Sequence, residues 1–340
     1  MNNYFLNKKV LISVVIICVF IIFIILGFFY FKQPETKSIG EITYGYQNWP
    51  GVLPYLIAYD QGFFNEKGLK VNLVKEESYV KEIENLTLGK TDFVGDIALI
   101  DVVKEVSHGN NLKVVLATDY SNRADGIVAR KDIDMVSKLK GKRVAVEEGT
   151  LGEYLLYDAL KKNNLSLSDL KIVNLSAQEG AQAFIRGEVD AAVTYEPDLS
   201  QAVAGGNGLR PYTSLSSPGL IIDVLAFRPD FVAKNPDKVS AVVSAYIKAM
   251  DFFNANPEKS YIIGANYFGI TPAEFKDQLA GIKLMNKEDN NLAMSYKTSV
   301  ESLHGAVIQA NEFLKNKGTI KDNVDSIEII DPKFIRELNK

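Results

Sequence analysis

The 340-residue chain has 38 Lys and Arg residues against 42 Asp and Glu residues, a net charge of −4 at pH 7, and 47% hydrophobic residues. This composition is ordinary for a globular protein, and the length predicts more than one domain. The mildly acidic balance, without clusters of Lys and Arg, argues against nucleic acid as a partner. Cys18 is the only cysteine, so the body of the chain has no disulfide, no thiolate nucleophile and no cysteine-based metal site.

An apolar run near the N-terminus is long enough to cross a membrane. Residues 10–31 contain no charged residue, and about 22 residues at about 1.5 Å each span a hydrocarbon core of about 30 Å. A signal peptide would have a shorter core and a small-residue cleavage site, whereas Phe28, Phe29 and Tyr30 are bulky. We therefore expect an uncleaved single-pass anchor in the cell membrane, with an extracytoplasmic (periplasmic or extracellular) body; cleavage after export is the alternative.

A β-α-β unit opens the folded body. Residues 42–46 alternate as a strand does, residues 53–60 predict a helix, and residues 68–74 predict the next strand. This order implies a parallel pair joined by a right-handed crossover. The pattern continues with a helix after Ser78, a strand at residues 92–96, a helix at 97–106, and strands at 112–117 and 124–130.

Residues 139–156 predict a strand, a glycine turn and a helix, in which Val144–Val146 is the strand and Gly149-Thr150 opens the helix. The N-terminus of such a helix can bind an acidic or polar group of a ligand through its backbone N–H groups. A Gly-x-x-Asp turn between a helix and a strand occurs at Gly89–Asp92 and again at Gly187–Asp190. This repetition favours two lobes of similar design.

The last third of the chain is mostly helical. Residues 220–227 predict an apolar strand that returns the chain to the first lobe, and helices begin at Asn235-Pro236, Asn256-Pro257 and Thr271-Pro272. Residues 290–316 predict one long amphipathic helix. We expect these helices to cover the first lobe.

The order of these elements resembles one family of binding proteins. The residues that carry the resemblance are Trp49-Pro50-Gly51, Gly62-Phe63-Phe64, Gly68–Val71, the strand and glycine turn at 139–150, Gly187–Ala191, and Glu196-Pro197. They are similar to the substrate-binding proteins of nitrate/sulfonate/taurine-type ABC importers, a group that includes binders of thiamine-pyrimidine precursors. The similarity extends over residues 41–320.

The resemblance implies an α/β, two-lobed, periplasmic-binding-protein-like (type II) clamshell, here with an N-terminal transmembrane helix. Such a protein captures a small solute by hinge closure and delivers it to the permease and ATPase subunits of an importer. We expect a monomer without a cofactor. The expected division is a cytoplasmic tail (1–9), an anchor (10–31), a linker (32–40), lobe 1 (41–123), lobe 2 (124–220), a return to lobe 1 with C-terminal helices (221–330), and a tail (331–340).

Loops at the carboxyl ends of the strands supply the candidate ligand-binding residues. Trp49, the only tryptophan, could stack on a planar or cationic ligand or pack beneath the first helix. Glu196 could accept hydrogen bonds from a ligand amine or be a solvated turn residue. Asp223 lies in an apolar strand, where an unpaired carboxylate is costly, so it either pairs internally or meets a ligand. The full set is Asn48, Trp49, Pro50, Asp96, Asp119, Tyr120, Ser121, Gly149, Thr150, Gly152, Tyr195, Glu196, Ser217 and Asp223.

The charged candidates are acidic. Asp96, Asp119, Glu196 and Asp223 are expected near the cleft, and Arg123 is the one basic residue that could oppose them. We therefore hypothesise a neutral or partly cationic heterocyclic or amine-bearing solute in preference to nitrate or sulfonate. The two histidines lie on predicted helices without carboxylates at metal-ligand spacing, so we expect no metal site.

Two other functions fit parts of the same pattern. A membrane-anchored sensory module would use the same clamshell and signal through a partner protein. A pyrimidine-precursor synthase-like enzyme is the other alternative, since some relatives of this fold use a histidine and a cysteine-rich iron site. The body contains no cysteine, nucleophile elbow, P-loop or zinc-helix motif, so we expect no catalysis.

Overall fold

The computed structural model describes residues 37–299 and 302–338. Residues from Ile39 onward form one compact unit. Within the described ranges, no helix is both long enough and apolar enough to cross a membrane. The anchor predicted at residues 10–31 lies outside the described residues.

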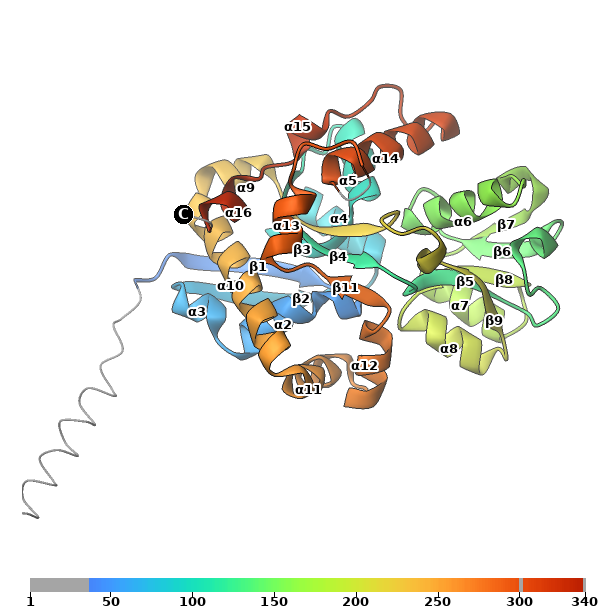
Figure 1. Cartoon of the computed structure of the whole chain (residues 1–340), viewed down its shortest axis with the longest axis horizontal. Helices are drawn as coiled ribbons and strands as arrows, with labels where there is room; N and C mark the ends of the chain where they lie inside the picture. The colour runs from blue at the N-terminus through green and yellow to red at the C-terminus, as the bar shows by residue number, and fades with distance from the viewer. Residues whose placement is uncertain (1–36, 300–301, 339–340) are drawn as a thin grey trace, which may run out of the picture. The chain divides into compact units, whose positions relative to one another are not determined.

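A six-stranded sheet forms the centre of the first lobe (Figure 1). The first strand of the chain pairs in parallel with the second and third, which confirms the predicted parallel β-α-β unit. The returning strand runs antiparallel to both of its neighbours. In spatial order the strands are β11 (Ile282–Leu284), β4 (Lys113–Ser121), β10 (Ile222–Phe227), β3 (Phe93–Ala98), β1 (Gly40–Tyr46) and β2 (Leu69–Lys75).

A five-stranded sheet forms the centre of the second lobe (Figure 1). Its spatial order is β7 (Lys171–Asn174), β6 (Arg143–Val146), β8 (Ala191–Tyr195), β5 (Asp125–Ala129) and β9 (Leu209–Thr213). Strand β6 is parallel to both neighbours, whereas β5 is antiparallel to β8 and β9. Strands β7, β9 and β11 were not predicted. Strands β7 and β9 lie at sheet edges and are mostly only half-buried, and β11 is a three-residue edge strand, so their apolar patterns are weak.

Helices cover both sheets, and several begin at the predicted caps. The side chains of Ser78, Thr150, Ser176 and Thr271 each accept a hydrogen bond from a backbone N–H of the first turn. The helices of the first lobe are α2 (Leu53–Asp60), α3 (Phe63–Glu66), α4 (Tyr79–Thr87), α5 (Leu99–Ser107), α9 (Pro229–Lys234), α10 (Pro236–Ala255), α11 (Pro257–Phe268), α12 (Pro272–Leu279), α13 (Lys287–Ala293), α14 (Leu303–Lys317), α15 (Ser326–Ile329) and α16 (Lys333–Glu337). Those of the second lobe are α6 (Leu151–Lys162), α7 (Ala177–Ile185) and α8 (Asp198–Gly205). Short 3-10 turns occur at Pro50–Val52, Val136–Leu139, Leu167–Asp169 and Ser214–Ser216.

Two predicted boundaries are wrong. The single helix expected at residues 290–316 is two helices, α13 and α14, because Ser302 caps a new helix by accepting the N–H of His304. The helix expected from Ile97 begins at Leu99, because strand β3 continues to Ala98. The longer strand places Asp96 inside the sheet.

An aromatic cluster fills the core of the first lobe. The ring of Tyr44 on β1 stacks on Phe93 of β3 with centroids 4.6 Å apart, and Tyr55 of α2 packs against both Tyr44 and Tyr246 of α10. All four rings are fully buried. This packing holds β1, β3 and α2 in fixed positions behind the cavity described below.

The buried amide of Asn290 joins α13 to strand β4. Its Oδ1 accepts the N–H of Ala117 at 2.8 Å, and its Nδ2 donates to the carbonyl of Ala117 at 2.9 Å. Substitution Asn290→Leu would leave both backbone groups unsatisfied, so we expect the free energy of unfolding to fall by about 2–4 kcal/mol. Urea unfolding followed by the fluorescence of Trp49 measures this loss. The exposed Asn323→Leu is the control, and equal stability of the two variants would contradict the assignment.

Candidate functional site

Two chain segments cross between the lobes, from β4 to β5 and from β9 to β10. Ser214 Oγ lies 2.7 Å from Ser121 Oγ and accepts the N–H of Arg123 at 2.7 Å. The N–H of Ser121 donates to the carbonyl of Ile221 at 3.1 Å, which ties the two crossings together. These contacts define a hinge, and Ser121 belongs to it.

A cavity lies beside this hinge and takes its walls from both lobes. The space between its lining atoms amounts to about 260 Å³, part of it open to solvent. A second, partly open space of about 300 Å³, the inner cavity, adjoins it on the side of the second lobe. The central cavity is lined by Gln47, Trp49, Tyr79, Asp96, Asp125, Leu151, Tyr195, Ile221 and Asp223. The inner cavity shares Tyr79, Asp125, Leu151 and Tyr195 and adds Glu147, Thr150, Gly152, Leu155, Ala177, Val193 and Thr194.

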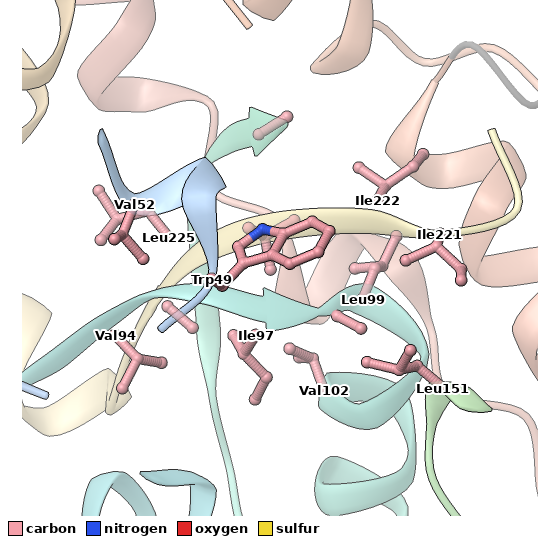
Figure 2. Packing of buried hydrophobic residues seen from close by; sticks show 14 of the residues in the cluster. Trp49, Val52, Val94, Ile97, Leu99, Val102, Leu151, Ile221, Ile222 and Leu225 are labelled. Atoms are coloured by element: carbon pink, nitrogen blue, oxygen red, sulfur yellow. The ribbon is translucent and has the colours of Figure 1, made fainter. Parts of the chain in front are cut away.

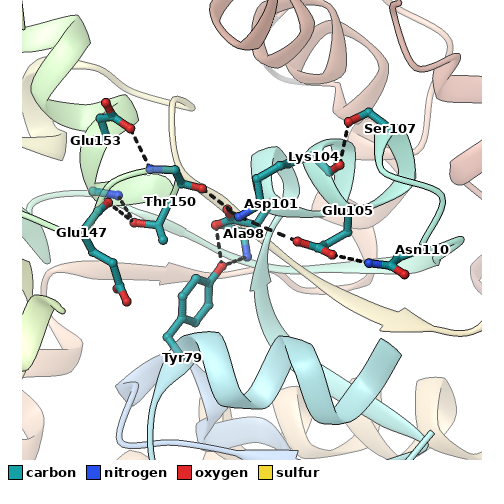
Figure 3. Close-up of polar contacts among 12 residues, drawn as sticks. Tyr79, Ala98, Asp101, Lys104, Glu105, Ser107, Asn110, Glu147, Thr150 and Glu153 are labelled. Atoms are coloured by element: carbon teal, nitrogen blue, oxygen red, sulfur yellow. Dashed lines mark hydrogen bonds and ion pairs between the residues drawn. The ribbon is translucent and has the colours of Figure 1, made fainter. Parts of the chain in front are cut away.

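Three aromatic side chains line the central cavity. Trp49 lies among apolar residues of β3, α5 and β10 (Figure 2), and its Nε1 donates to Asp119 Oδ2 at 3.3 Å. Tyr195 meets the indole edge-on from the second lobe, with ring centroids 6.0 Å apart. The hydroxyl of Tyr79 donates to Asp101 and accepts the N–H of Ala98, both at 2.9 Å, so its ring is held in place (Figure 3).

Three carboxylates line the same cavity with oxygens that lack partners. Within the described ranges, neither oxygen of Asp96 receives a hydrogen bond of good geometry, and Asp125 Oδ2 and Asp223 Oδ1 have none. Each of these residues is less than 5% exposed. Because an unpaired charge is costly in such a site, the carboxylates favour their protonated form until a counter-charge arrives.

Burial changes the acidity of this cluster. It raises the pKa of Asp96 to about 7, although the nearby Glu82 carboxyl and the backbone N–H groups of Gly95 and Gln47 act in the opposite direction. Burial also raises the pKa of Asp125 to about 7, against a hydrogen bond with Ser121. The pKa of Asp223 is raised by burial and then by the charges of Asp119 and Asp125.

Two further acids lie next to the cavity-lining carboxylates. Asp119 faces Asp223 across the pairing of β4 and β10, and burial raises the pKa of Asp119. Glu82 on α4 accepts a hydrogen bond from the side chain of Gln47 at 3.3 Å, and burial and the charge of Asp96 raise its pKa. The acidic cluster therefore extends behind the cavity wall.

The mouth of the cavity is also acidic. A groove of about 910 Å³ continues outward past Tyr79 and Tyr195, and its charged residues are Lys75, Glu76, Glu77, Glu147 and Asp198. Burial and the charge of Glu196 raise the pKa of Asp198 to about 6. Among the described residues, no Lys, Arg or His lines the central or inner cavity. Arg123, the basic partner considered from sequence, is exposed at the hinge.

The N-terminus of α6 is already occupied by carboxylates of the chain itself. The N–H of Gly149 donates to Glu153 Oε2 at 2.7 Å. Burial raises the pKa of Asp101, and the backbone N–H of Leu151 is one of the groups that oppose this rise by stabilising the carboxylate. Lys104 donates to Asp101 at 3.1 Å and to the carbonyl of Gly149 at 2.7 Å (Figure 3). The sequence indicated that this helix end can bind an acidic or polar group of a ligand, whereas in the structure carboxylates of the chain itself lie against it.

The predicted site residues fall into four groups. Trp49, Asp96, Tyr195 and Asp223 line the central cavity, Thr150 and Gly152 line the inner cavity, and Asn48 lies at the mouth. The remaining predicted residues line neither cavity nor the mouth among the described residues. They are Pro50, Asp119, Tyr120, Ser121, Gly149, Glu196 and Ser217.

Local partners explain why several of these residues turn away from the cavity. Glu196 is bound by Ser200 at 2.9 Å and by Arg210 at 3.0 Å. Ser217 is hydrogen-bonded to Tyr212 and to Lys162. Tyr120 lies beneath the ammonium of Lys283. The contacts of Glu196 with Arg210, of Ser217 with Lys162 and of Tyr120 with Lys283 join residues that are not neighbours in the sequence.

Sequence reasoning missed several cavity residues, namely Gln47, Tyr79, Asp125, Glu147, Leu151 and Ile221. Asp125 had a usable signal, because it is the first residue of an apolar strand, as Asp223 is the second residue of another. Tyr79 follows the helix cap Ser78 and carries no local mark of its role. Its position depends on tertiary contacts with Asp101 and Ala98.

Comparison with known proteins identifies a family model and several similar proteins, most of them named for binding and one a pyrimidine phosphate synthase. Residues 49–260 match the family model described as NMT1/THI5 like. A Bacillus subtilis protein named for binding aliphatic sulfonates is 31% identical over 228 residues, covering 64% of this chain and 66% of its own. The taurine-binding periplasmic protein of Escherichia coli is 24% identical, covering 77% and 82%. The alkanesulfonate-binding protein of Xanthomonas axonopodis pv. citri, solved with MOPS, shares the fold with a TM-score of 0.72 at 19% identity, covering 86% and 98%.

The raised pKa of Asp125 predicts how stability depends on pH. The folded carboxyl keeps its proton up to about pH 7, whereas an unfolded Asp loses it near pH 4. The folded state therefore binds more protons between these values, so its stability falls as pH rises from about 4 to 7 and then levels. We expect Asp125→Asn to increase the free energy of unfolding at pH 8 by about 2 kcal/mol and to change it little at pH 4.

Asp190→Asn is the matched control. Burial alone would raise the pKa of Asp190, but hydrogen bonds from Arg143 and the charge of Arg130 outweigh it and hold the pKa below its usual value. This substitution should destabilise the protein at neutral pH. Urea unfolding of both variants at pH 4, 6 and 8 measures the difference. A loss of stability in Asp125→Asn at pH 8 would contradict the unpaired state of that carboxylate.

Proposed function

The chain belongs to the NMT1/THI5-like family, and from this premise we propose that it is the solute-binding protein of an ABC importer. It binds a small solute in the cavity between the lobes and delivers it to the permease and ATPase subunits. The observation that carries the proposal is the cavity itself, because its walls come from both lobes and it lies against the hinge. Closure around a ligand at such a position is a hinge motion.

Contacts across the cleft support a closed arrangement of the lobes. Lys104 of α5 donates to the carbonyl of Gly149, and Lys317 of α14 binds Glu153 of α6. Phe313 of α14 packs against Tyr154 and Tyr157 of α6 with ring centroids 4.7 and 4.9 Å apart. These contacts join elements of different lobes, so they must separate when the hinge opens.

We propose binding rather than catalysis as the role of the cavity. Its polar residues are carboxylates, the amide of Gln47, and Tyr and Thr side chains, and no nucleophile paired with a base appears along its described walls. Among the residues that the structure describes, no cluster of His, Cys, Asp or Glu could hold a metal ion. We further propose that residues 10–31 anchor a monomeric body outside the cell membrane, close to the permease.

The proposal predicts that a solute shortens the distance between the lobes. With Cys18 replaced by Ser, spin labels at Val80→Cys on α4 and Ala204→Cys on α8 report this distance by electron–electron double resonance. Both positions are exposed and lie outside the cavity walls. We expect a low-molecular-weight extract of bacterial cells to shift the distribution toward shorter distances. A distribution unchanged by the complete extract would contradict the proposed function.

The contact between Lys317 and Glu153 should favour the closed arrangement before any solute binds. We expect Lys317→Met to shift the unliganded distance distribution toward longer values, because an ion pair of this kind contributes about 1 kcal/mol. Lys315→Met, at an exposed lysine two residues earlier on α14, is the control. Equal distributions for the two variants would show that this ion pair does not hold the lobes together.

A further inference from the structure

This inference rests on the proposed function and names the chemical class of the solute. We propose that the cavity binds a small organic cation, whose positively charged nitrogen lies among Asp96, Asp125 and Asp223 and between the rings of Trp49, Tyr79 and Tyr195. The relatives named above are described as binding sulfonates or taurine, so this chain would differ from them in the charge that it recognises.

The first argument is the charge of the walls. Three buried carboxylates with unpartnered oxygens line the central cavity. The charged residues that the structure assigns to the central and inner cavities are all acidic. A sulfonate or nitrate would find no positively charged side chain there and would be repelled by any of these carboxyls that ionises. A cation supplies the counter-charge that these carboxylates lack, together with N–H groups that can donate to their oxygens.

The second argument concerns the backbone N–H groups at the start of α6. Helix N-termini beside a cleft are a common means of binding anions. Here Gly149 donates to Glu153, whose carboxylate is in turn bound by Lys317, and Asp101 lies against Leu151. Because carboxylates of the chain itself take the donors of Gly149 and Leu151, this end of α6 offers little to an oxyanion, and no basic side chain lines the described walls of the central and inner cavities.

The third argument is the aromatic enclosure. Trp49 and Tyr195 approach edge to face from opposite lobes, and Tyr79 borders both cavities. The hydroxyl of Tyr79 is engaged with Asp101 and Ala98, and the indole N–H with Asp119. These side chains therefore present ring surface to the solute, and ring faces attract cations. Carboxylates combined with aromatic rings suit an organic ammonium or amidinium better than a hydrated metal ion.

The fourth argument is the acidic mouth. Glu76, Glu77, Glu147 and Asp198 line the outer groove, where Lys75 is the one basic residue among those described. A cleft lined by charge of one sign concentrates solutes of the opposite sign and accelerates their association. The mouth and the cavity therefore select for the same charge.

The class of solute can be tested without knowing its identity. A low-molecular-weight extract of bacterial cells is separated by ion exchange into cationic, neutral and anionic fractions, and each is added to the full-length protein. We expect the cationic fraction alone to raise Tm and to shorten the Val80–Ala204 distance. Stabilisation by the anionic or the neutral fraction would overturn the inference and leave the proposed function standing. No response to any fraction or to the unseparated extract would overturn the proposed function as well.

Charge-neutral variants locate the binding site. Asp125→Asn and Asp223→Asn should weaken the apparent affinity for the active fraction at least 10-fold while the proteins remain folded. Asp322→Asn, at an exposed acid of the first lobe far along the chain from the cavity residues, is the matched control and should bind as the parent does. Unchanged binding by both cavity variants would contradict the assignment of the carboxylates.

Protons provide a second readout of the ligand charge. The carboxyl of Asp96 interacts electrostatically with five titratable groups around it. They are Glu82 on α4, Tyr44, Tyr55, and Asp119 and Asp223 on the neighbouring strands. A cation must displace the proton that this group holds near neutral pH. The apparent affinity for the cationic fraction should therefore increase at least several-fold from pH 5.5 to 7.5. An anion would favour the protonated site, and binding that weakens over this range would contradict the inference.

Discussion

Burial of carboxylates without a counter-charge is the constraint on which this site depends. Asp96, Asp125 and Asp223 lie in or next to β-strands, almost completely removed from water, and the described chain offers them no Lys or Arg. A protein designed only for stability would replace such residues by neutral ones, because each unpaired charge costs several kcal/mol. Buried unpaired carboxylates are typical of functional sites, where a ligand supplies the counter-charge that the protein lacks.

The fold explains how these acids come together. Asp96 lies on β3, Asp223 on the returning strand β10, and Asp125 begins β5 directly after the hinge. Since β10 pairs with both β3 and β4, one strand brings Asp223 next to Ala98 and Asp119. The aromatic core formed by Tyr44, Tyr55 and Phe93 fixes the strands from behind. Asp96 and Asp223 belong to the first lobe and Asp125 to the second, so the site is complete only when the hinge segments bring the two lobes together.

Much of the fold could be predicted from the sequence, because its signals are local. The caps at Ser78, Thr150, Ser176 and Thr271 and the parallel pairing of β1 with β2 follow from patterns of a few residues. Residues that line the candidate cavity were predictable where a residue type was out of place, as with Trp49 in a glycine-proline loop and Asp223 in an apolar strand. Tyr79 and the internal pairing of Glu196 with Arg210 depend on residues that meet only in the folded chain. The strand-turn-helix pattern at α6 predicts a helix N-terminus that is free to bind a ligand. The contact between Gly149 and Glu153 that occupies it is seen only in the folded chain.

The most direct test of this account is the acidity of the cavity carboxyls, measured by carbon-13 NMR on protein labelled at its aspartate carboxyl groups. In the absence of solute, Asp96 and Asp125 should titrate near pH 7. Addition of the solute should lower both pKa values, because a bound cation stabilises the ionised form. Titration near pH 4 in the solute-free protein, or a further rise of both values on binding, would contradict an acidic cavity that awaits a cation.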